Sequence, residues 1–183
     1  MGVRNYLIDG VSGTGKTAVA EELQRRGHHV IHGDRVLAYV GDPATGEPLD
    51  PPDHQGLAAS VAWLNQHWIW PVDKVRLLIA DRSNAISFFC GASRNFHRFI
   101  DLFDGVFVLE VDPETLNRRL ANRPEDEFGG RPAERELIGR LHATQEDVPQ
   151  NAVVIDSTAP VATVVDEILL KCRAADQGGA TRV

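Results

Sequence analysis

The stretch Gly10-Val11-Ser12-Gly13-Thr14-Gly15-Lys16-Thr17 matches the phosphate-binding pattern G-x-x-x-x-G-K-[ST] at every fixed position. Residues 3–9, just ahead of it, are mostly apolar and prone to form a strand. Residues 18–26, just behind it, carry apolar side chains at helical spacing and are followed by Gly27. The pattern therefore lies between a predicted strand and a predicted helix, and this context distinguishes a nucleotide-binding loop from a chance match.

The residue types of this loop suit phosphate chemistry. Glycines let the backbone curl so that N–H groups point at the β- and γ-phosphates, and the following helix adds the positive end of its dipole. Lys16 supplies a mobile cation, and the Thr17 hydroxyl is placed to ligate Mg²⁺. A glycine-rich turn without a ligand explains the glycines but not the Lys-Thr pair. We predict that a nucleoside triphosphate contacts Gly10, Ser12, Gly13, Thr14, Gly15, Lys16 and Thr17.

Composition narrows the possible partners. At 183 residues the chain is long enough for one substantial core, so we expect one domain over residues 1–172 and a frayed tail over 173–183. A net charge of −7 argues against a nucleic-acid partner. No run approaches the roughly 20 apolar residues of a membrane-spanning helix, and we expect no cleavable signal ahead of the first strand. Two cysteines, Cys90 and Cys172, form no disulfide framework, which favours a reduced, cytoplasmic setting.

Short apolar runs alternate with helical patterns along the chain. This alternation predicts an α/β fold of three layers, in which a five-stranded parallel sheet is flanked by helices and ligands bind at the carboxyl ends of the strands. The turn-rich segment 41–56 predicts a loop or mobile cap. The predicted strands are 3–9, 29–32, 85–90, 105–111 and 152–156, and the predicted helices are 18–26, 57–70, 72–81, 95–103, 114–122, 132–147 and 160–172.

Residues 77–81 allow two interpretations. As a strand they would end in Asp81, at the usual place of a second acidic group near Mg²⁺. The helical stripe that begins at Val72 favours a helix instead. Asp34, which follows the predicted strand 29–32, is then the better candidate for that group, beside Mg²⁺ or the acceptor hydroxyl. A simple turn residue after Gly33 is the alternative for Asp34.

Four features resemble the nucleotide-kinase-like branch of P-loop proteins, which holds adenylate, cytidylate, shikimate and gluconate kinases. These features are Ile8-Asp9-Gly10 entering the loop, Asp34 after the second strand, the pair Arg118-Arg119 ahead of an arginine-flanked loop, and a last strand leading into Asp156-Ser157-Thr158-Ala159-Pro160. Residues 89–95 and 126–130 also resemble bacterial ATP-binding proteins described as shikimate kinase-like. The resemblance spans most of the chain.

The resemblance implies a P-loop NTPase fold with strand order 2-3-1-4-5, an acceptor-side cap at about 35–80 and a lid at about 123–131. It implies that Arg118 or Arg119 lies against the base of ATP, and that Asp156 also lies at the nucleotide. The chain lacks the Asp-Gly-x-Pro-Arg of adenylate kinases, and the triple glycine and Asp-x-Asp of shikimate kinases. The acceptor therefore stays unidentified.

The resemblance also implies that Arg123 and Arg131 reach the phosphates, where guanidinium groups from a closing lid would stabilise the charge that spreads over the moving phosphoryl group. Local ion pairs with neighbouring glutamates are the alternative. Arg94 can hold a phosphate or carboxylate of an acceptor, whereas Ser93 and Asn95 can equally cap a helix. The tryptophans 63, 68 and 70 are expected to pack the cap onto the sheet, with stacking on an aromatic acceptor as the alternative.

The predicted function is ATP- and Mg²⁺-dependent transfer of the γ-phosphoryl group to a small molecule, either nucleotide-like or a small anionic metabolite. The residues predicted to take part in the reaction are Lys16, Asp34, Arg123 and Arg131, with Thr17 and Asp34 at the metal. A nucleotide-binding regulatory ATPase or switch that acts on a protein partner is the alternative. Dependence of turnover on an acceptor distinguishes the two.

Overall fold

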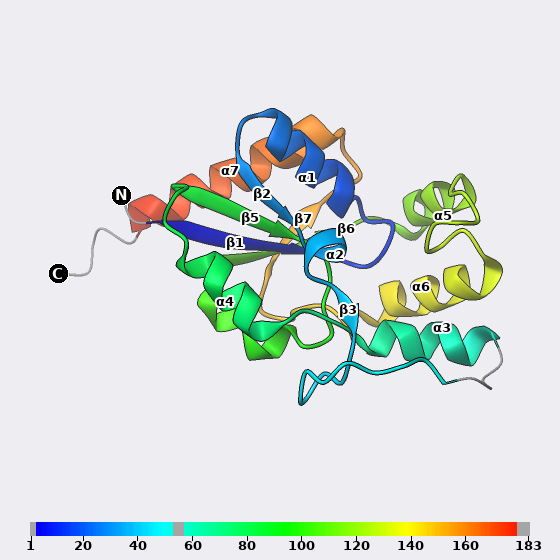
Figure 1. Cartoon of the computed structure of the whole chain (residues 1–183). Coiled ribbons are helices and arrows are strands. Elements are labelled where there is room, and N and C mark those ends of the chain that lie inside the picture. The colour runs from blue at the N-terminus through cyan, green and yellow to red at the C-terminus, as the bar shows by residue number, and fades with distance from the viewer. Residues whose placement is uncertain (1–2, 53–56, 179–183) are drawn as a thin grey trace.

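Strand β1 (Arg4–Asp9) lies at the centre of a parallel sheet and carries the phosphate-binding loop at its carboxyl end. The computed structural model describes residues 3–52 and 57–178 and is shown in Figure 1. Sheet order is β2-β5-β1-β6-β7, which is 2-3-1-4-5 when these five strands are counted along the chain, so the predicted order is confirmed. The other strands of this sheet are β2 (His29–His32), β5 (Ile86–Cys90), β6 (Gly105–Glu110) and β7 (Val153–Asp156).

Strand β1 is hydrogen-bonded on both edges, to β5 and to β6. Leu7 is opposite Phe89 of β5 and Val106 of β6. A strand paired on both edges and covered on both faces must be apolar along most of its length, which explains why Tyr6, Leu7 and Ile8 are all buried.

Helices cover both faces of the sheet. Figure 1 shows α1 and α7 together on one face and α4 on the other. The helices are α1 (Lys16–Arg25), α2 (Gly33–Val36), α3 (Leu57–Gln66), α4 (Val72–Ala80), α5 (Pro113–Ala121), α6 (Pro132–Thr144) and α7 (Val161–Gly178). Among the described residues, no helix is both long and apolar enough to span a membrane.

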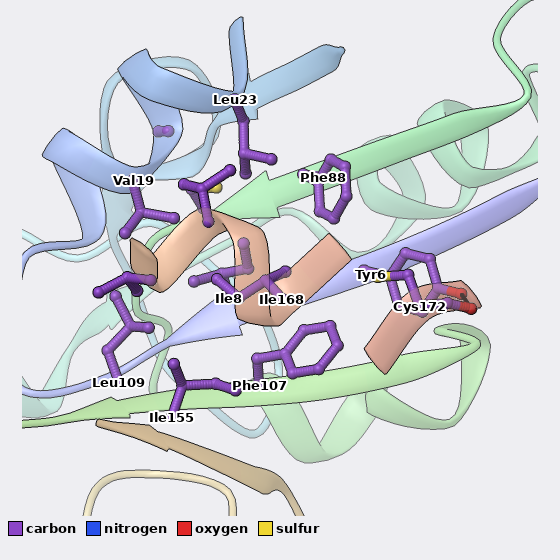
Figure 2. Close-up of a cluster of buried hydrophobic side chains, with 14 residues drawn as sticks. Tyr6, Ile8, Val19, Leu23, Phe88, Phe107, Leu109, Ile155, Ile168 and Cys172 are labelled. Atoms are coloured by element: carbon purple, nitrogen blue, oxygen red, sulfur yellow. Dashed lines mark hydrogen bonds between the residues drawn. The ribbon is translucent and has the colours of Figure 1, made fainter. Parts of the chain in front are cut away.

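The core on the α1/α7 face is shown in Figure 2. Val19 and Leu23 of α1 and Ile168 of α7 converge on Ile8 and Leu109 of the sheet. Leu23, Ile8 and Ile168 are fully buried, and each such side chain contributes roughly 1.5–3 kcal/mol by leaving water. This packing holds the start of α1, and with it the phosphate-binding loop, against the sheet.

The opposite face is built around Trp70, which is fully buried and stacks on Phe99 with ring centroids 5.8 Å apart. Its backbone N–H donates to Ser93 Oγ and Asn95 Oδ1, both at 3.1 Å, and Asn95 Nδ2 donates to the Trp70 carbonyl at 2.9 Å. Ser93 and Asn95 therefore bind the segment before α4 to the end of β5, which is a different role from the predicted helix capping.

A third apolar cluster lies beyond the carboxyl edge of the sheet. It joins Val61 of α3, Leu120 of α5 and Ile138 of α6 to Val11 of the phosphate-binding loop. Figure 1 shows α3 and α6 side by side, away from the sheet. These helices form one wall of the site described below.

The predicted helix 57–70 is wrong at its carboxyl end. Helix α3 stops at Gln66, and Trp68–Ile69 forms strand β4, paired antiparallel with β3 (Tyr39–Val40). Pro71 disfavours helical backbone at the residue before it, and the partner strand supplies the hydrogen bonds that a helix would have made. Residues 53–56 of the predicted cap loop lie outside the described residues.

The other predicted helices differ in smaller ways. The predicted helix 95–103 is two 3₁₀ helices, η1 (Phe96–Arg98) and η2 (Ile100–Leu102), because Phe99 between them adopts φ −145° as it packs on Trp70. Helix α6 ends three residues before Asp147, where Gln145 takes a left-handed φ of 53°. Helix α7 continues past Cys172 to Gly178, and residues 179–183 lie outside the described part.

The strand interpretation of residues 77–81 is wrong. Helix α4 continues to Ala80, and exposed Asp81 accepts a hydrogen bond from the Ser83 N–H at 2.9 Å. Asp81 precedes β5 and so lies at the amino edge of the sheet, opposite the phosphate-binding loop. Asp81 therefore cannot be the second acidic group near Mg²⁺, which would lie at the carboxyl edge.

Candidate nucleotide and acceptor site

A cavity of about 800 Å³ opens at the carboxyl edge of the sheet. The phosphate-binding loop forms its floor, and α3 and α6 form an apolar wall. Nine of the residues predicted from the sequence line it: Ser12, Gly13, Thr14, Gly15, Lys16, Thr17, Asp34, Arg119 and Arg123. Four predicted site residues are not among those that line the cavity: Gly10, Arg118, Arg131 and Asp156.

Three glycines give the loop its curl. Gly10, Gly13 and Gly15 have φ values of 146°, 92° and 107°. A Cβ on Gly10 would lie 2.7 Å from the carbonyl oxygen of Leu109, and one on Gly13 would lie 2.7 Å from Leu116 Cδ1. Gly10 thus needs glycine for space as well as for φ, because a backbone oxygen lies in the way, whereas Gly13 needs it mainly for φ.

The Lys16 ammonium donates to the carbonyls of Gly10 and Val11, so the lysine folds back across its own loop. Burial lowers the pKa of Lys16, and the carboxylates of Asp34 and then Asp9 raise it. Its contacts are to neutral carbonyls, so negatively charged phosphate oxygens can replace them with stronger bonds in which donor and acceptor are both charged.

The loop offers one candidate protein ligand for the magnesium ion that the sequence predicts, the Thr17 hydroxyl. Among the described residues, no group of three or more His, Cys, Asp or Glu side chains could hold a metal ion. Thr17 is exposed and lines the cavity, so its hydroxyl can serve as a single protein ligand. Mg²⁺ usually keeps several waters and binds through few protein oxygens plus substrate phosphates, which suits such a sparse site.

Asp9 lies buried beneath the loop and is 1% exposed. Its Oδ1 accepts a hydrogen bond from the Gly10 N–H at 2.6 Å. Burial raises the pKa of Asp9 to about 7, although the cations Lys16 and Arg94 oppose this shift. Asp9 therefore holds the first turn of the loop and is not among the residues that line the cavity.

This raised pKa predicts a pH-dependent stability. Between the unfolded value of 3.8 and the folded value of about 7, the unfolded chain gives up the Asp9 proton while the folded protein keeps it. The free energy of unfolding should therefore fall as pH rises through that window. In Asp9→Asn this contribution is absent. We expect thermal unfolding measured from pH 4.5 to 8 to show that the stability of wild type, relative to that of Asp9→Asn, falls as pH rises to about 7. A constant difference between the two proteins would contradict the assignment.

Asp34 is held at the carboxyl end of β5. Its Oδ1 accepts from the Ala92 N–H at 3.0 Å and from Trp68 Nε1 at 3.4 Å. A Cβ on Gly91 would lie 2.8 Å from that same Oδ1, so a glycine is needed for the close approach. Within the described residues no hydrogen bond uses Oδ2, which leaves this oxygen for a ligand.

Arg94 is already paired. Its guanidinium donates to Asp147 Oδ2 at 2.7 Å, and the two side chains are 13% and 8% exposed. Both residues line the cavity. Asp147 was not predicted as a site residue, because in the sequence it is the last residue of the predicted helix 132–147, next to Glu146, and only the tertiary fold brings it to Arg94.

Arg119 and Arg118 differ sharply in position. Arg119 Nη1 donates to the carbonyls of Gly13 and Thr14 at 3.3 and 3.2 Å, and its Nη2 donates to the Ser157 carbonyl at 2.7 Å. Arg118 is exposed and donates to Thr115 of its own helix. Arg119 is thus the member of the pair that lies at the nucleotide loop.

This difference makes Arg118→Ala a matched control for Arg119→Ala. Loss of the Arg119 contacts should weaken ATP binding by about tenfold, in line with a lost hydrogen bond to a charged group. Removal of Arg118 should change ATP affinity by less than about twofold, since surface substitutions far from a site are usually small. Calorimetric titration with a non-hydrolysable ATP analogue measures both. Equal losses in the two variants would contradict the assignment.

The segment 123–131, predicted from the sequence as a lid, contacts the phosphate-binding loop through Arg123. Arg123 Nη1 donates to Ser12 Oγ at 2.9 Å and to the Phe128 carbonyl. The backbone N–H groups of Gly129 and Arg131 donate to Glu134 Oε2 at 2.8 and 3.2 Å, so the far end of the lid is bound to the start of α6. Arg131 itself is exposed.

At the end of β7, the residue that lies at the cavity is Ser157 and not Asp156. Asp156 is exposed and accepts from the Thr158 N–H at 2.9 Å. Ser157 is buried, lines the cavity and donates its hydroxyl to the Thr14 carbonyl. Ser157 was quoted only as part of the run that follows the last strand and was not predicted as a site residue, although its position directly after a strand end was a usable signal.

The family model described as "AAA domain" matches residues 7–139 of the chain. This match covers both the phosphate-binding loop and the lid. No curated protein matches the chain by sequence.

Solved structures with the same fold include three small-molecule kinases. A shikimate kinase from Bacteroides thetaiotaomicron superimposes with a TM-score of 0.56 at 15% identity, covering 92% of this chain and 98% of that one. A gluconokinase from Sinorhizobium meliloti 1021 gives 0.55 at 18% identity and 98% of both chains, and a sugar kinase from Janibacter sp. HTCC2649 gives 0.52 at 19%, covering 92% and 93%. The predicted resemblance to P-loop kinases of the nucleoside monophosphate kinase and shikimate kinase-like branch is thus confirmed for the fold.

Proposed function

The chain belongs to the AAA domain family, and from this premise we propose that it is a kinase that transfers the γ-phosphoryl group of ATP to a hydroxyl group of a small molecule. The observation that carries the proposal is the shared cavity: Lys16 and Asp34 line the same space of about 800 Å³. That volume suits a small-molecule site and leaves room for an acceptor beside a triphosphate.

Lys16 and the loop N–H groups would bind the β- and γ-phosphates. The Thr17 hydroxyl would hold Mg²⁺, which neutralises charge on the phosphate oxygens when it is bound. Phosphoryl transfer needs positioning and charge neutralisation more than strong base chemistry. The loop is held in place by the hydrogen bonds of Asp9 and Arg119, so it can position the phosphates with little reorganisation.

Asp34 would orient the acceptor. Its Oδ1 is occupied by Ala92 and Trp68, so Oδ2 can accept a hydrogen bond from the attacking hydroxyl. Lys16 lies close enough for the Asp34 charge to raise its pKa, which supports placing the carboxylate beside the phosphates. A role beside Mg²⁺ stays the alternative for this residue.

Arg123 would contact the transferring group from the lid. Its present partner on the loop is the neutral Ser12 hydroxyl, which a phosphate oxygen can displace. Arg131 is exposed and is not among the lining residues, so its predicted part in the reaction would require a different lid position. A regulatory ATPase that acts on a protein is the alternative, and it would show no dependence on a small acceptor.

Asp34→Asn tests the proposed function. The amide oxygen can still accept from Ala92, so the local structure and ATP affinity should be kept within a few-fold. Acceptor-dependent ADP release should fall by about 100-fold or more, as expected for a lost positioning carboxylate.

Asp81→Asn is the matched control, because Asp81 is an exposed aspartate at the other edge of the sheet. It should keep full activity. A large loss of ATP affinity in Asp34→Asn would indicate that Asp34 acts at the metal site. Retained activity would show that Asp34 takes no part in the reaction.

Arg123→Ala tests the lid. If Arg123 contacts the phosphoryl group as charge develops, kcat should fall by roughly 10³ while ATP affinity changes only modestly. Arg131→Ala, measured beside it by steady-state kinetics, should lose less than about threefold if the lid acts in the position described. Equal losses in both variants would instead support the sequence prediction that both arginines act.

A further inference from the structure

We propose that the acceptor is an uncharged molecule with hydroxyl groups, and that the Arg94–Asp147 pair excludes carboxylate and phosphate compounds from the acceptor side. This inference rests on the proposed function and narrows its substrate class. It departs from the sequence prediction of a nucleotide-like or small anionic acceptor.

The cations of the cavity are already assigned to other partners. Among the described residues that line it, the basic ones are Lys16, Arg94, Arg119 and Arg123. Lys16, Arg119 and Arg123 all donate to the phosphate-binding loop, on the nucleotide side. Arg94 is therefore the described cation left for the acceptor side.

Arg94 is neutralised from within the protein. Asp147 Oδ2 lies 2.7 Å from its Nη1, and the Asp147 carbonyl accepts from the same nitrogen at 2.5 Å. Both side chains are largely buried, and separating a buried pair leaves an uncompensated charge at high cost. An anionic acceptor would have to displace Asp147 or lie next to its charge.

The remaining charges of the acceptor side are negative. Asp34 faces the same space, and only neutral N–H groups donate to it among the described residues. Lys16 is the cation nearest to Asp34, but it contacts the loop carbonyls and would bind the phosphates of ATP, so with the Arg94–Asp147 pair balanced the Asp34 charge repels a second carboxylate or phosphate at this side. A hydroxyl group meets no such repulsion and can donate to Asp34 Oδ2.

The wall around the pair suits a neutral ligand with an apolar part. Asn65 and Trp68 line the cavity there, with Val61, Leu64 and Leu141 as apolar neighbours. Among the described residues, Arg94 Nε and Asp147 Oδ1 have no hydrogen-bond partner, and both atoms are buried, so an acceptor in the cavity does not reach them.

A neighbouring hollow of about 360 Å³ shares Arg94 and Asp147 with the main cavity. Arg140 also lines this hollow, and its Nε lies 3.9 Å from Glu146 Oε1. A ligand that extends into this hollow would again meet a balanced pair and no unpaired arginine among the described residues.

The first experiment measures anion binding directly. Protein saturated with a non-hydrolysable ATP analogue and Mg²⁺, so that the nucleotide loop is filled, is titrated calorimetrically with inorganic phosphate. Wild type should not bind phosphate measurably. Asp147→Asn, which frees the Arg94 charge, should bind it at least about tenfold more tightly than wild type. The double variant Arg94→Gln/Asp147→Asn should lose this binding again.

Phosphate binding to wild type that is lost in Arg94→Gln would overturn the inference. A folded Asp147→Asn variant that binds phosphate no more tightly than wild type would also overturn the inference. That result would mean that Asp147 does not keep the Arg94 charge from binding anions.

The second experiment needs no variant. Wild type with ATP and Mg²⁺ is offered matched compounds that differ in one charged group: a hexose and its aldonate, a nucleoside and its 5′-monophosphate, an aromatic alcohol and its carboxylate. Phosphorylated product, detected by ³¹P NMR, should form from uncharged members. Faster product formation from the charged member of a pair would overturn the inference. No product from any compound, with the calorimetric result as expected, would count against phosphoryl transfer while the exclusion of anions stands.

Discussion

Strand β1 is hydrogen-bonded to β5 on one edge and to β6 on the other, and this double pairing sets the geometry of the site. The end of β1 carries the phosphate-binding loop. The end of β5 brings Asp34 and Arg94 to one side of that loop, and the chain after β6 leads into α5, whose Arg119 lies at the other side. Parallel strands place all their carboxyl ends at one edge, so segments far apart in the sequence converge there.

Charge balance is the second organising feature. Lys16 lies among the buried Asp9 and the more exposed Asp34, while its direct contacts are neutral carbonyls. Arg94 lies against Asp147 at 2.7 Å. Lys16 and Arg119 on the nucleotide side contact backbone carbonyls, and Arg123 lies 3.8 Å from the exposed Glu127 Oε2, whereas Arg94 on the acceptor side is neutralised by the largely buried Asp147. In the function that we propose, this asymmetry separates the site for the donor from the site for the acceptor.

Local signals were enough for most of the secondary structure. Short apolar runs such as β1 were predicted as strands from their own residues, without knowledge of the strands that pair with them. The loop after β1 was readable because its glycines and its Lys-Thr pair serve chemistry within eight consecutive residues. Strand β4 was missed because its hydrogen bonds go to Tyr39–Val40, a partner that the local helical spacing of Leu64 and Trp68 cannot reveal.

The sequence by itself determined the alternation of strands and helices and the loop with Lys16 and Thr17, because these depend on neighbouring residues, while the strand order came from the resemblance to P-loop kinases. Only the tertiary structure decided between Arg118 and Arg119, which adjoin in the chain yet point to different sides of one helix. It also excluded Asp81, since the direction of β5 puts that residue at the wrong edge. Asp147 became visible only as the partner of Arg94, because a contact across 53 residues of chain leaves no mark in local spacing.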